Sequence, residues 1–208
     1  MDEERLEYLK GTTTVGLACE DGVILATDTR ATAGKLVASK RAQKVYKIAD
    51  HIGVSVAGGV GDTQDLVRIL KGELNYYQVS EGEPMKVHSA AKTVANVLHS
   101  NRLFPYLAVL AVAGVDESGS DLYLVSLDGS MIEEEKLSTG SGSQVAYGIL
   151  ESEFEEDMTT NDALPIAKKA IENAMKRDIA TGNEINIAVI TDDGYQELSS
   201  EEIKNISN

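Results

Sequence analysis

The residues best suited to chemistry lie in one short segment, residues 11–16, which reads Gly-Thr-Thr-Thr-Val-Gly. A threonine hydroxyl is a poor nucleophile until a base removes its proton, and a free α-amine on the same residue can act as that base. Cleavage of the peptide bond after Gly11 would expose such an amine on Thr12. The segment alone is also compatible with a threonine-rich edge strand, so its meaning depends on the residues that the fold brings to it.

An α-amine suits the role of base better than a lysine does. With a pKa near 7.7–8.0, roughly 10–15% of an α-amine is unprotonated at pH 7, against about 0.04% of an unperturbed lysine. General-base catalysis rewards a base whose pKa lies near the working pH. Before cleavage the same nitrogen is an amide and has no basicity. Residues 1–11 therefore predict a leader that keeps Thr12 inactive, and Gly11 presents little steric hindrance to attack by Thr12.

Two glycine-rich segments suggest other chemistry. Residues 57–62 (AGGVGD) lie between an expected strand and an expected helix, where a phosphate cradle would form. They lack the spacing of the dinucleotide fingerprint, and no Gly-Lys-Ser/Thr follows them. Residues 140–143 (GSGS) do not match the Gly-x-Ser-x-Gly nucleophile elbow. Neither segment predicts a binding function by itself.

Composition and charge exclude several classes of function. The chain has 208 residues and is 42% hydrophobic, which is enough for one domain with its own core. Its net charge of −15 argues against nucleic-acid binding, which needs a clustered cationic surface. The longest apolar runs, 107–115 and 185–190, are too short to span a membrane. Residues 1–11 are acidic and polar, unlike a signal or transit peptide, so we expect a cytoplasmic protein.

Cysteine and histidine content predicts no metal, cofactor or disulfide. The one cysteine, Cys19, cannot form an internal disulfide, and its apolar strand-like surroundings predict a packed core residue. The three histidines, His51, His88 and His99, show no ligand spacing, although the last two could share a helix face.

Hydrophobic periodicity predicts the elements that must position these residues. The order along the chain is strands, two helices, strands, two helices, strands. Expected strands span 13–20, 23–27, 45–48, 52–57, 107–115, 122–127, about 131–137 and 185–191, with a short edge strand and a tail helix after them. Asp21-Gly22 and Asp128-Gly129 are turn signals. Single strands do not alternate with single helices, so the pattern favours antiparallel sheets with helices on their outer faces rather than a doubly wound parallel sheet.

The expected helices are read from apolar stripes at three- and four-residue spacing. The first contains Leu66, Leu70 and Leu74, and the second is expected to begin near Pro84. Two more span 145–154 and about 160–179. Pro165 is expected to mark the start of the last helix or to kink it.

From residue 11 onward the sequence resembles the β subunits of proteasome core particles, of the archaeal type and of the N-terminal nucleophile hydrolase family. The likeness begins with GTTTVGLACEDGVILATDTRAT at 11–32 and continues through four more segments in the same order and spacing. These are KVYKI at 44–48, SVAGGVGD at 55–62, STGSGSQVAYGILE at 138–151 and KRDIATGNEINIAVIT at 176–191.

The resemblance implies an α+β fold, a four-layer αββα sandwich of two mainly antiparallel sheets flanked by helices. It divides the chain into a cleavable leader, 1–11, and a single hydrolase domain, 12–208. The implied partners are other β subunits in a ring, a ring of α subunits, a regulatory unfolding ATPase and unfolded protein substrates. It implies no cofactor.

The resemblance also assigns roles within a threonine endopeptidase site. Thr12 is the nucleophile, with Asp28 and Lys44 as the acid and base beside it; each of these two ions alone would be read as a surface charge. The Gly58 N–H faces the developing oxyanion. Ser141 and Asp178 organise the Thr12 amine and its water, and Thr181 stands where the family usually has serine.

The family's primary specificity pocket corresponds here to six residues without charge: Ala31, Thr32, Ala42, Tyr46, Val56 and Val60. Such a lining predicts that the residue before the scissile bond is apolar, because nothing would neutralise a buried charge. The alternative is that these are ordinary core residues and that the pocket lies elsewhere.

Two other functions are consistent with parts of the sequence. A catalytically silent β subunit would be a structural component of the ring, but such subunits typically lack the threonine, the lysine or the Gly-Thr junction. A bacterial proteasome-like protease also uses an N-terminal threonine, but the chain length and residues 138–151 favour the proteasome itself. An α subunit is disfavoured because it carries an N-terminal helix where this chain has Gly11-Thr12.

Overall fold

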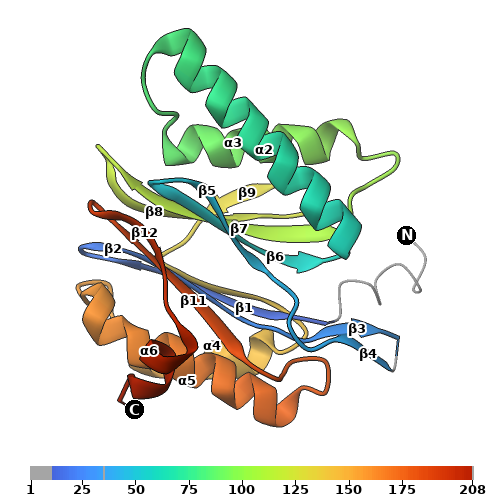
Figure 1. Cartoon of the computed structure of the whole chain (residues 1–208), viewed down its shortest axis with the longest axis vertical. Coiled ribbons are helices and arrows are strands. Elements are labelled where there is room, and N and C mark those ends of the chain that lie inside the picture. Colours follow the sequence, from blue (N-terminus) through green and yellow to red (C-terminus); the bar gives the residue numbers. More distant parts are fainter. Residues whose placement is uncertain (1–10, 35, 208) are drawn as a thin grey trace.

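The computed structural model describes residues 11–34 and 36–207. These residues form two stacked sheets with helices on both outer faces (Figure 1). The αββα arrangement predicted from the resemblance is thereby confirmed. Of the predicted leader, only Gly11 lies within the described residues.

The first sheet contains the strand that follows Thr12. Its order is β10 (Lys136–Gly140), β1 (Thr13–Cys19), β2 (Gly22–Asp28), β11 (Ile185–Thr191) and β12 (Gly194–Glu197), and all neighbours are antiparallel. The predicted turn at Asp21-Gly22 joins β1 to β2, so that Cys19 faces Gly22 in the register. Strands from the N-terminal and C-terminal parts of the chain thus lie in one sheet, and β11 pairs directly with β2.

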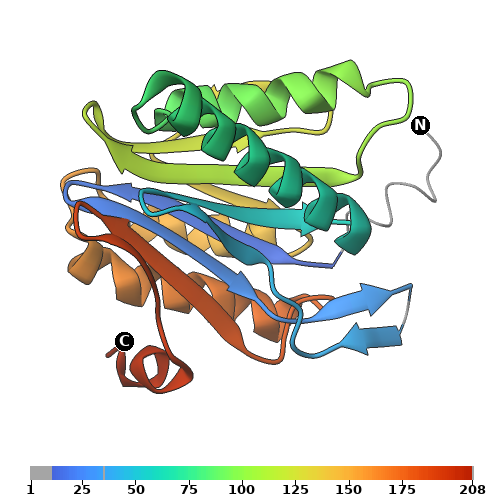
Figure 2. The ribbon, with the colours of Figure 1, turned by 45° about the horizontal axis from the view of Figure 1, so that its top comes forward.

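The second sheet is built from the middle of the chain. Its order is β5 (Val45–Ala49), β6 (Ile52–Gly58), β7 (Ala108–Asp116), β8 (Gly119–Val125) and β9 (Met131–Glu133), again antiparallel throughout. Figure 2 shows the two sheets stacked face to face.

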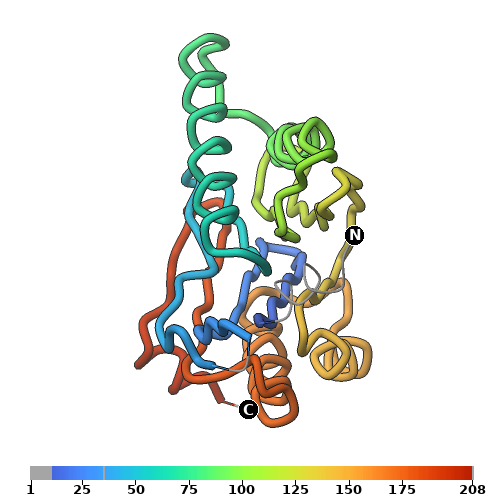
Figure 3. Tube along the Cα trace, turned by 90° about the vertical axis from the view of Figure 1, so that its right-hand side faces the viewer, coloured from blue at the N-terminus to red at the C-terminus, as the bar shows by residue number. Residues whose placement is uncertain are grey.

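Helices cover both outer faces of the sandwich. The second sheet is covered by α2 (Val60–Glu81) and α3 (Val87–Ser100), and the first by α4 (Ser143–Glu153) and α5 (Thr160–Arg177), with the short α6 (Ser200–Asn205) near the C-terminus. The tube view in Figure 3 shows α2 reaching beyond the edge of the sheet. Among the described residues no helix is both long and apolar enough to cross a membrane.

Three apolar layers hold the sandwich together, and strand alternation assigns side chains to them. On β2, Ile24 and Ala26 pack towards the helices, whereas Val23 and Leu25 pack between the sheets. The layer between the sheets also contains Val45. This layer is therefore what fixes the two sheets against each other.

Some expected boundaries were wrong. The strand expected at about 131–137 is two strands, β9 and β10, that belong to different sheets. The second helix begins at Val87 rather than near Pro84. The expected helix at about 160–179 is confirmed as α5, which begins at Thr160, so Pro165 does not mark its start. The Thr159 side chain caps α5 by accepting a hydrogen bond from the Asp162 N–H, and this cap sets the start of the helix. Cys19 is buried, as expected.

A hairpin that the sequence did not predict projects from the end of the sandwich (Figure 2). It pairs β3 (Ala31–Ala33) with β4 (Leu36–Ser39). Leu36 and Val37 are 74% and 46% exposed, so this segment lacks the buried face that marks a strand in a sequence.

The layer between the sheets leads to a stability prediction. Leu25 is fully buried, and Leu25→Ala should lower the free energy of unfolding by about 2–5 kcal/mol, because it removes buried methyl groups and leaves a cavity. Urea unfolding of the isolated chain measures this change. Leu103→Ala is the matched control, because Leu103 is 83% exposed. Equal stability of the two variants would contradict the assignment of Leu25 to the core.

Candidate active site

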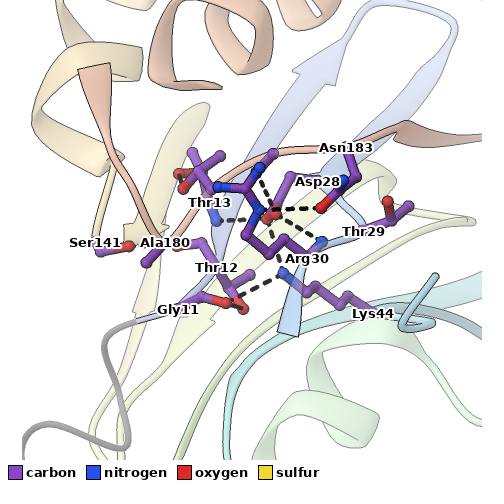
Figure 4. Close-up of polar contacts among 12 residues, drawn as sticks. Gly11, Thr12, Thr13, Asp28, Thr29, Arg30, Lys44, Ser141, Ala180 and Asn183 are labelled. Atoms are coloured by element: carbon purple, nitrogen blue, oxygen red, sulfur yellow. Dashed lines mark hydrogen bonds and ion pairs between the residues drawn. The ribbon is translucent and has the colours of Figure 1, made fainter. Parts of the chain in front are cut away.

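Thr12 lies just before β1 at one end of the first sheet, with only 4% of its surface exposed. Its hydroxyl donates a hydrogen bond of 2.6 Å to the Gly11 carbonyl oxygen. In Figure 4 this carbonyl oxygen also lies at the end of a dashed line from Lys44. The hydroxyl and the peptide bond that precedes it are therefore in direct contact.

Asp28, the last residue of β2, is a fully buried carboxylate whose two oxygens both accept hydrogen bonds. Its Oδ1 accepts from the Lys44 ammonium at 2.8 Å and from the Thr13 N–H at 3.0 Å. Its Oδ2 accepts from the Arg30 and Gly182 N–H groups, both at 2.9 Å. Four donors compensate the desolvation of this charge, so the surface-ion alternative for Asp28 is wrong.

Lys44 immediately precedes β5 and is 6% exposed, so it too is no surface ion. Besides its ion pair with Asp28, its Nζ donates a hydrogen bond of 3.2 Å to the Gly11 carbonyl oxygen. Burial lowers the pKa of Lys44, while the Asp28 carboxylate opposes that shift. The ammonium is thus held beside Thr12 in a site where it gives up its proton more readily than an exposed lysine does.

A chain of hydroxyls and one carboxylate lies on the other side of the threonines. The hydroxyls of Thr13 and Thr181 are 2.7 Å apart, and Thr181 Oγ1 donates to Asp178 Oδ2 at 2.5 Å. Ser141 Oγ donates to the same carboxylate oxygen, and its backbone N–H donates to the Thr12 carbonyl oxygen at 2.9 Å. The structure therefore brings Ser141, Asp178 and Thr181 together, and the extra methyl group of Thr181 does not prevent its hydrogen bonds.

Gly58 is the last residue of β6, where the chain passes very close to β7. Its φ is 150°, and a Cβ there would lie 2.1 Å from the Leu107 carbonyl oxygen. Gly140 is equally restricted: its φ is 93°, and a Cβ would lie 1.9 Å from the Thr12 carbonyl oxygen. Only glycine fits these two positions.

The six predicted pocket residues lie in different surroundings. Ala31 and Thr32 are half-buried on β3, and the Ala42 N–H donates to the Thr29 carbonyl oxygen at 2.8 Å. Together they lie where the hairpin joins the sandwich.

The other three predicted pocket residues belong to the second sheet and its first helix. Tyr46 donates from its hydroxyl to the Gln43 carbonyl oxygen at 2.7 Å, and its ring packs against the core that contains Val56, which is 2% exposed. Val60 begins α2 and is 57% exposed. The pocket assignment remains a prediction.

Sequence reasoning missed three residues that complete this network: Thr13, Arg30 and Asn183. The Arg30 side chain donates to Asn183, from which it is separated by 153 positions, at 3.0 Å. No local pattern connects residues so distant in sequence. Thr13 could have been predicted, because alternation along a strand places its side chain on the face opposite that of Thr14.

Metal-ligating side chains do not converge in this part of the molecule. Within the described ranges, no group of three or more His, Cys, Asp or Glu side chains could hold a metal ion.

Burial raises the pKa of the Cys19 thiol to about 12. His88 packs edge-on against Tyr123, and His99 Nδ1 contacts the Asp128 carbonyl oxygen.

Comparison with known proteins agrees with this geometry. A family model described as Proteasome subunit matches residues 8–190. The chain belongs to the proteasome subunit family. A proteasome subunit beta from Ferroglobus placidus is 48% identical over 201 residues, 96% of each chain. Another, from Methanosarcina barkeri, is 45% identical over 207 residues, 99% of this chain and 97% of the relative.

A third similar protein is the proteasome subunit beta of Methanosphaerula palustris, 46% identical over 199 residues, which cover 95% of this chain and 94% of that one. The predicted membership in the β-subunit family is thus confirmed. The predicted enzyme class, that of threonine endopeptidases, agrees with this membership.

The hydrogen bonds of Asp28 predict that even a conservative substitution there strongly lowers the free energy of unfolding. Asp28→Asn removes the charge that pairs with Lys44 and places an NH₂ group against N–H donors. It should lower the free energy of unfolding by about 3–5 kcal/mol, because it leaves a buried ammonium without its partner. Urea unfolding measures this cost, with Asp157→Asn on the exposed surface as the control. If both variants lowered the free energy of unfolding by the same small amount, the prediction would be contradicted.

Proposed function

We propose that Thr12 is the nucleophile of a threonine endopeptidase and that it first cleaves its own precursor after Gly11. The observation that carries this proposal is that the Thr12 hydroxyl and the Lys44 ammonium both contact the Gly11 carbonyl oxygen, at 2.6 and 3.2 Å. A cation beside that oxygen polarises the carbonyl, and the hydroxyl is next to the atom it must attack.

Peptide hydrolysis then follows an acyl-enzyme route. The Thr12 hydroxyl attacks the scissile carbonyl while the free α-amine accepts its proton and passes it to the leaving amine. The Gly58 N–H stabilises the oxyanion, and water hydrolyses the resulting ester to regenerate Thr12. The Lys44 ammonium lowers the pKa of the attacking hydroxyl, and Asp28 holds that ammonium in place.

Ser141, Asp178 and Thr181 hold the amine and the attacking water. Support comes from their mutual hydrogen bonds and from the Ser141 N–H, which donates to the Thr12 carbonyl oxygen at 2.9 Å. These groups fix the backbone of the residue whose amine must act as the base.

The working form is a ring of these chains stacked against a ring of α subunits, with unfolded proteins supplied by an unfolding ATPase. Family membership and the names of the relatives, proteasome subunit beta, support the rings. A catalytically silent subunit is disfavoured because Gly11, Thr12 and Lys44 are all present and in contact. A bacterial proteasome-like protease is disfavoured by the close likeness of archaeal β subunits over almost the whole chain.

Self-cleavage is tested by the N-terminal sequence of the assembled particle. Processed chains should begin Thr-Thr-Thr-Val, the sequence that follows Gly11. Thr12→Ala should abolish both leader removal and peptidase activity, and Thr12→Ser should retain part of both because the hydroxyl and the amine remain. Thr93→Ala, at a half-buried position of α3, is the control. An active particle whose chains still begin at Met1 would exclude the mechanism.

The pocket is tested with fluorogenic peptides that differ only in the residue before the scissile bond. Cleavage after Leu, Phe or Tyr should be fastest, because burial of apolar surface contributes about 25 cal/mol per Å². Burial of an unpaired charge costs several kcal/mol, which disfavours Arg and Glu. Tyr46→Phe should keep this preference, since the Tyr46 hydroxyl already donates to Gln43. Faster cleavage after Arg or Glu would show that the pocket is wrongly assigned.

A further inference from the structure

Arg30 reaches from the end of β2 to a loop far away in the sequence. Its Nε donates to Asn183 Oδ1 at 3.0 Å (Figure 4). Its Nη1 donates to the Ile179 carbonyl oxygen at 2.6 Å. A guanidinium is planar and presents its donors in a fixed fork. Two bonds from one fork therefore fix both the distance and the orientation of residues 178–183 relative to β2.

The guanidinium also lies directly over the backbone of this loop. A Cβ at Gly182 would lie 2.4 Å from Arg30 Nη2, so a side chain at this position would displace the guanidinium. The next residue, Asn183, has a φ of 75°, in the left-handed region that asparagine tolerates better than most residues. Gly182 and Asn183 thus shape the loop so that it receives the Arg30 side chain.

The same loop supplies three groups to the proposed active site. Gly182 donates its N–H to Asp28, Thr181 contacts the Thr13 hydroxyl, and Asp178 accepts from Ser141. The Arg30 backbone N–H donates to the same Asp28 oxygen as Gly182 does, at the same distance of 2.9 Å. The Arg30–Asn183 contact therefore spans the two segments that converge on Asp28.

We propose that Arg30 and Asn183 are positioning residues for the peptidase reaction. Their contact holds the loop of residues 178–183 against β2, so that Asp28, Asp178 and Thr181 keep the geometry that activates Thr12. This role rests on the proposed function of Thr12 as the nucleophile. Neither side chain contacts Thr12 itself in the described contacts, so both act through the groups that they hold.

The chemistry of the pair makes conservative and disruptive variants distinguishable. Asn183→Asp keeps an oxygen acceptor for Arg30 and tolerates the left-handed φ, whereas Asn183→Gly tolerates that φ and removes the acceptor. Arg30→Lys keeps the charge but loses the fork. A residue needed only for charge would tolerate the lysine, and a residue needed for geometry would not.

The test measures kcat and KM of particles assembled with α subunits from full-length chains. Arg30→Ala, Arg30→Lys and Asn183→Gly should lower kcat by about 10- to 100-fold and change KM by less than about twofold, because small displacements of catalytic groups have effects of this size. Asn183→Asp should stay within about threefold of the wild type. The Arg30→Ala/Asn183→Gly double variant should be no slower than the worse single variant, because the two residues act as one unit.

Arg177→Ala is the matched control, because it removes an exposed cation one residue before Asp178 and should leave kcat unchanged. Wild-type kcat in Arg30→Lys or Asn183→Gly, additive losses in the double variant, or equal losses in Asn183→Asp and Asn183→Gly would overturn the proposal. If particles with Arg30→Ala do not assemble, the two Asn183 variants test the proposal instead, because both leave Arg30 in place. An active Thr12→Ala particle would instead refute the proposed function, so the two failures are distinguishable.

Discussion

The ion pair between Asp28 and Lys44 is the interaction on which the rest of the site depends. Both side chains are almost completely removed from water, and a buried carboxylate or ammonium is tolerated only with a partner. Asp28 belongs to the first sheet, whereas Lys44 leads into the second. The pair therefore joins the two sheets at one point. Because Asp28 also accepts three backbone N–H groups, it fixes the start of β1, the end of β2 and the loop of residues 178–183 around a single carboxylate.

Apolar packing determines where this ion pair can form. Val45, the residue after Lys44, packs with Leu25 of β2 in the layer between the sheets. Burial of each such side chain contributes on the order of 1.5–3 kcal/mol, whereas the net contribution of a buried ion pair is close to zero. The core therefore supplies the stability, and the ion pair supplies the position of the charge. Both fix the position of Thr12, because Thr12 directly precedes β1 and its neighbour Thr13 is hydrogen-bonded to Asp28.

Much of this arrangement could be predicted from local sequence, and the reasons for the exceptions are physical. The Asp21-Gly22 turn and the apolar runs around it were sufficient for β1 and β2, because turn chemistry and burial agree there. The β3–β4 hairpin was missed because Leu36 and Val37 are exposed and leave no buried periodicity. Asp28, Lys44, Ser141, Asp178 and Thr181 were found only through the family resemblance, which carries information about distant contacts. Arg30 and Asn183 were not found because a hydrogen bond across 153 positions leaves no pattern in either segment.

The order of strands in the first sheet has a consequence for the synthesis of the protein on the ribosome. Gly182, which completes the Asp28 network, follows Asp28 by 154 positions, and β11, the second neighbour of β2, follows it. A nascent chain that has just exposed Thr12, Asp28 and Lys44 therefore lacks the loop that aligns them and one neighbour of β2. Thr12, the proposed nucleophile, is synthesised early, but its surroundings are completed only after the loop of residues 178–183 has been translated. The order of the strands along the chain therefore places the completion of the site late in translation.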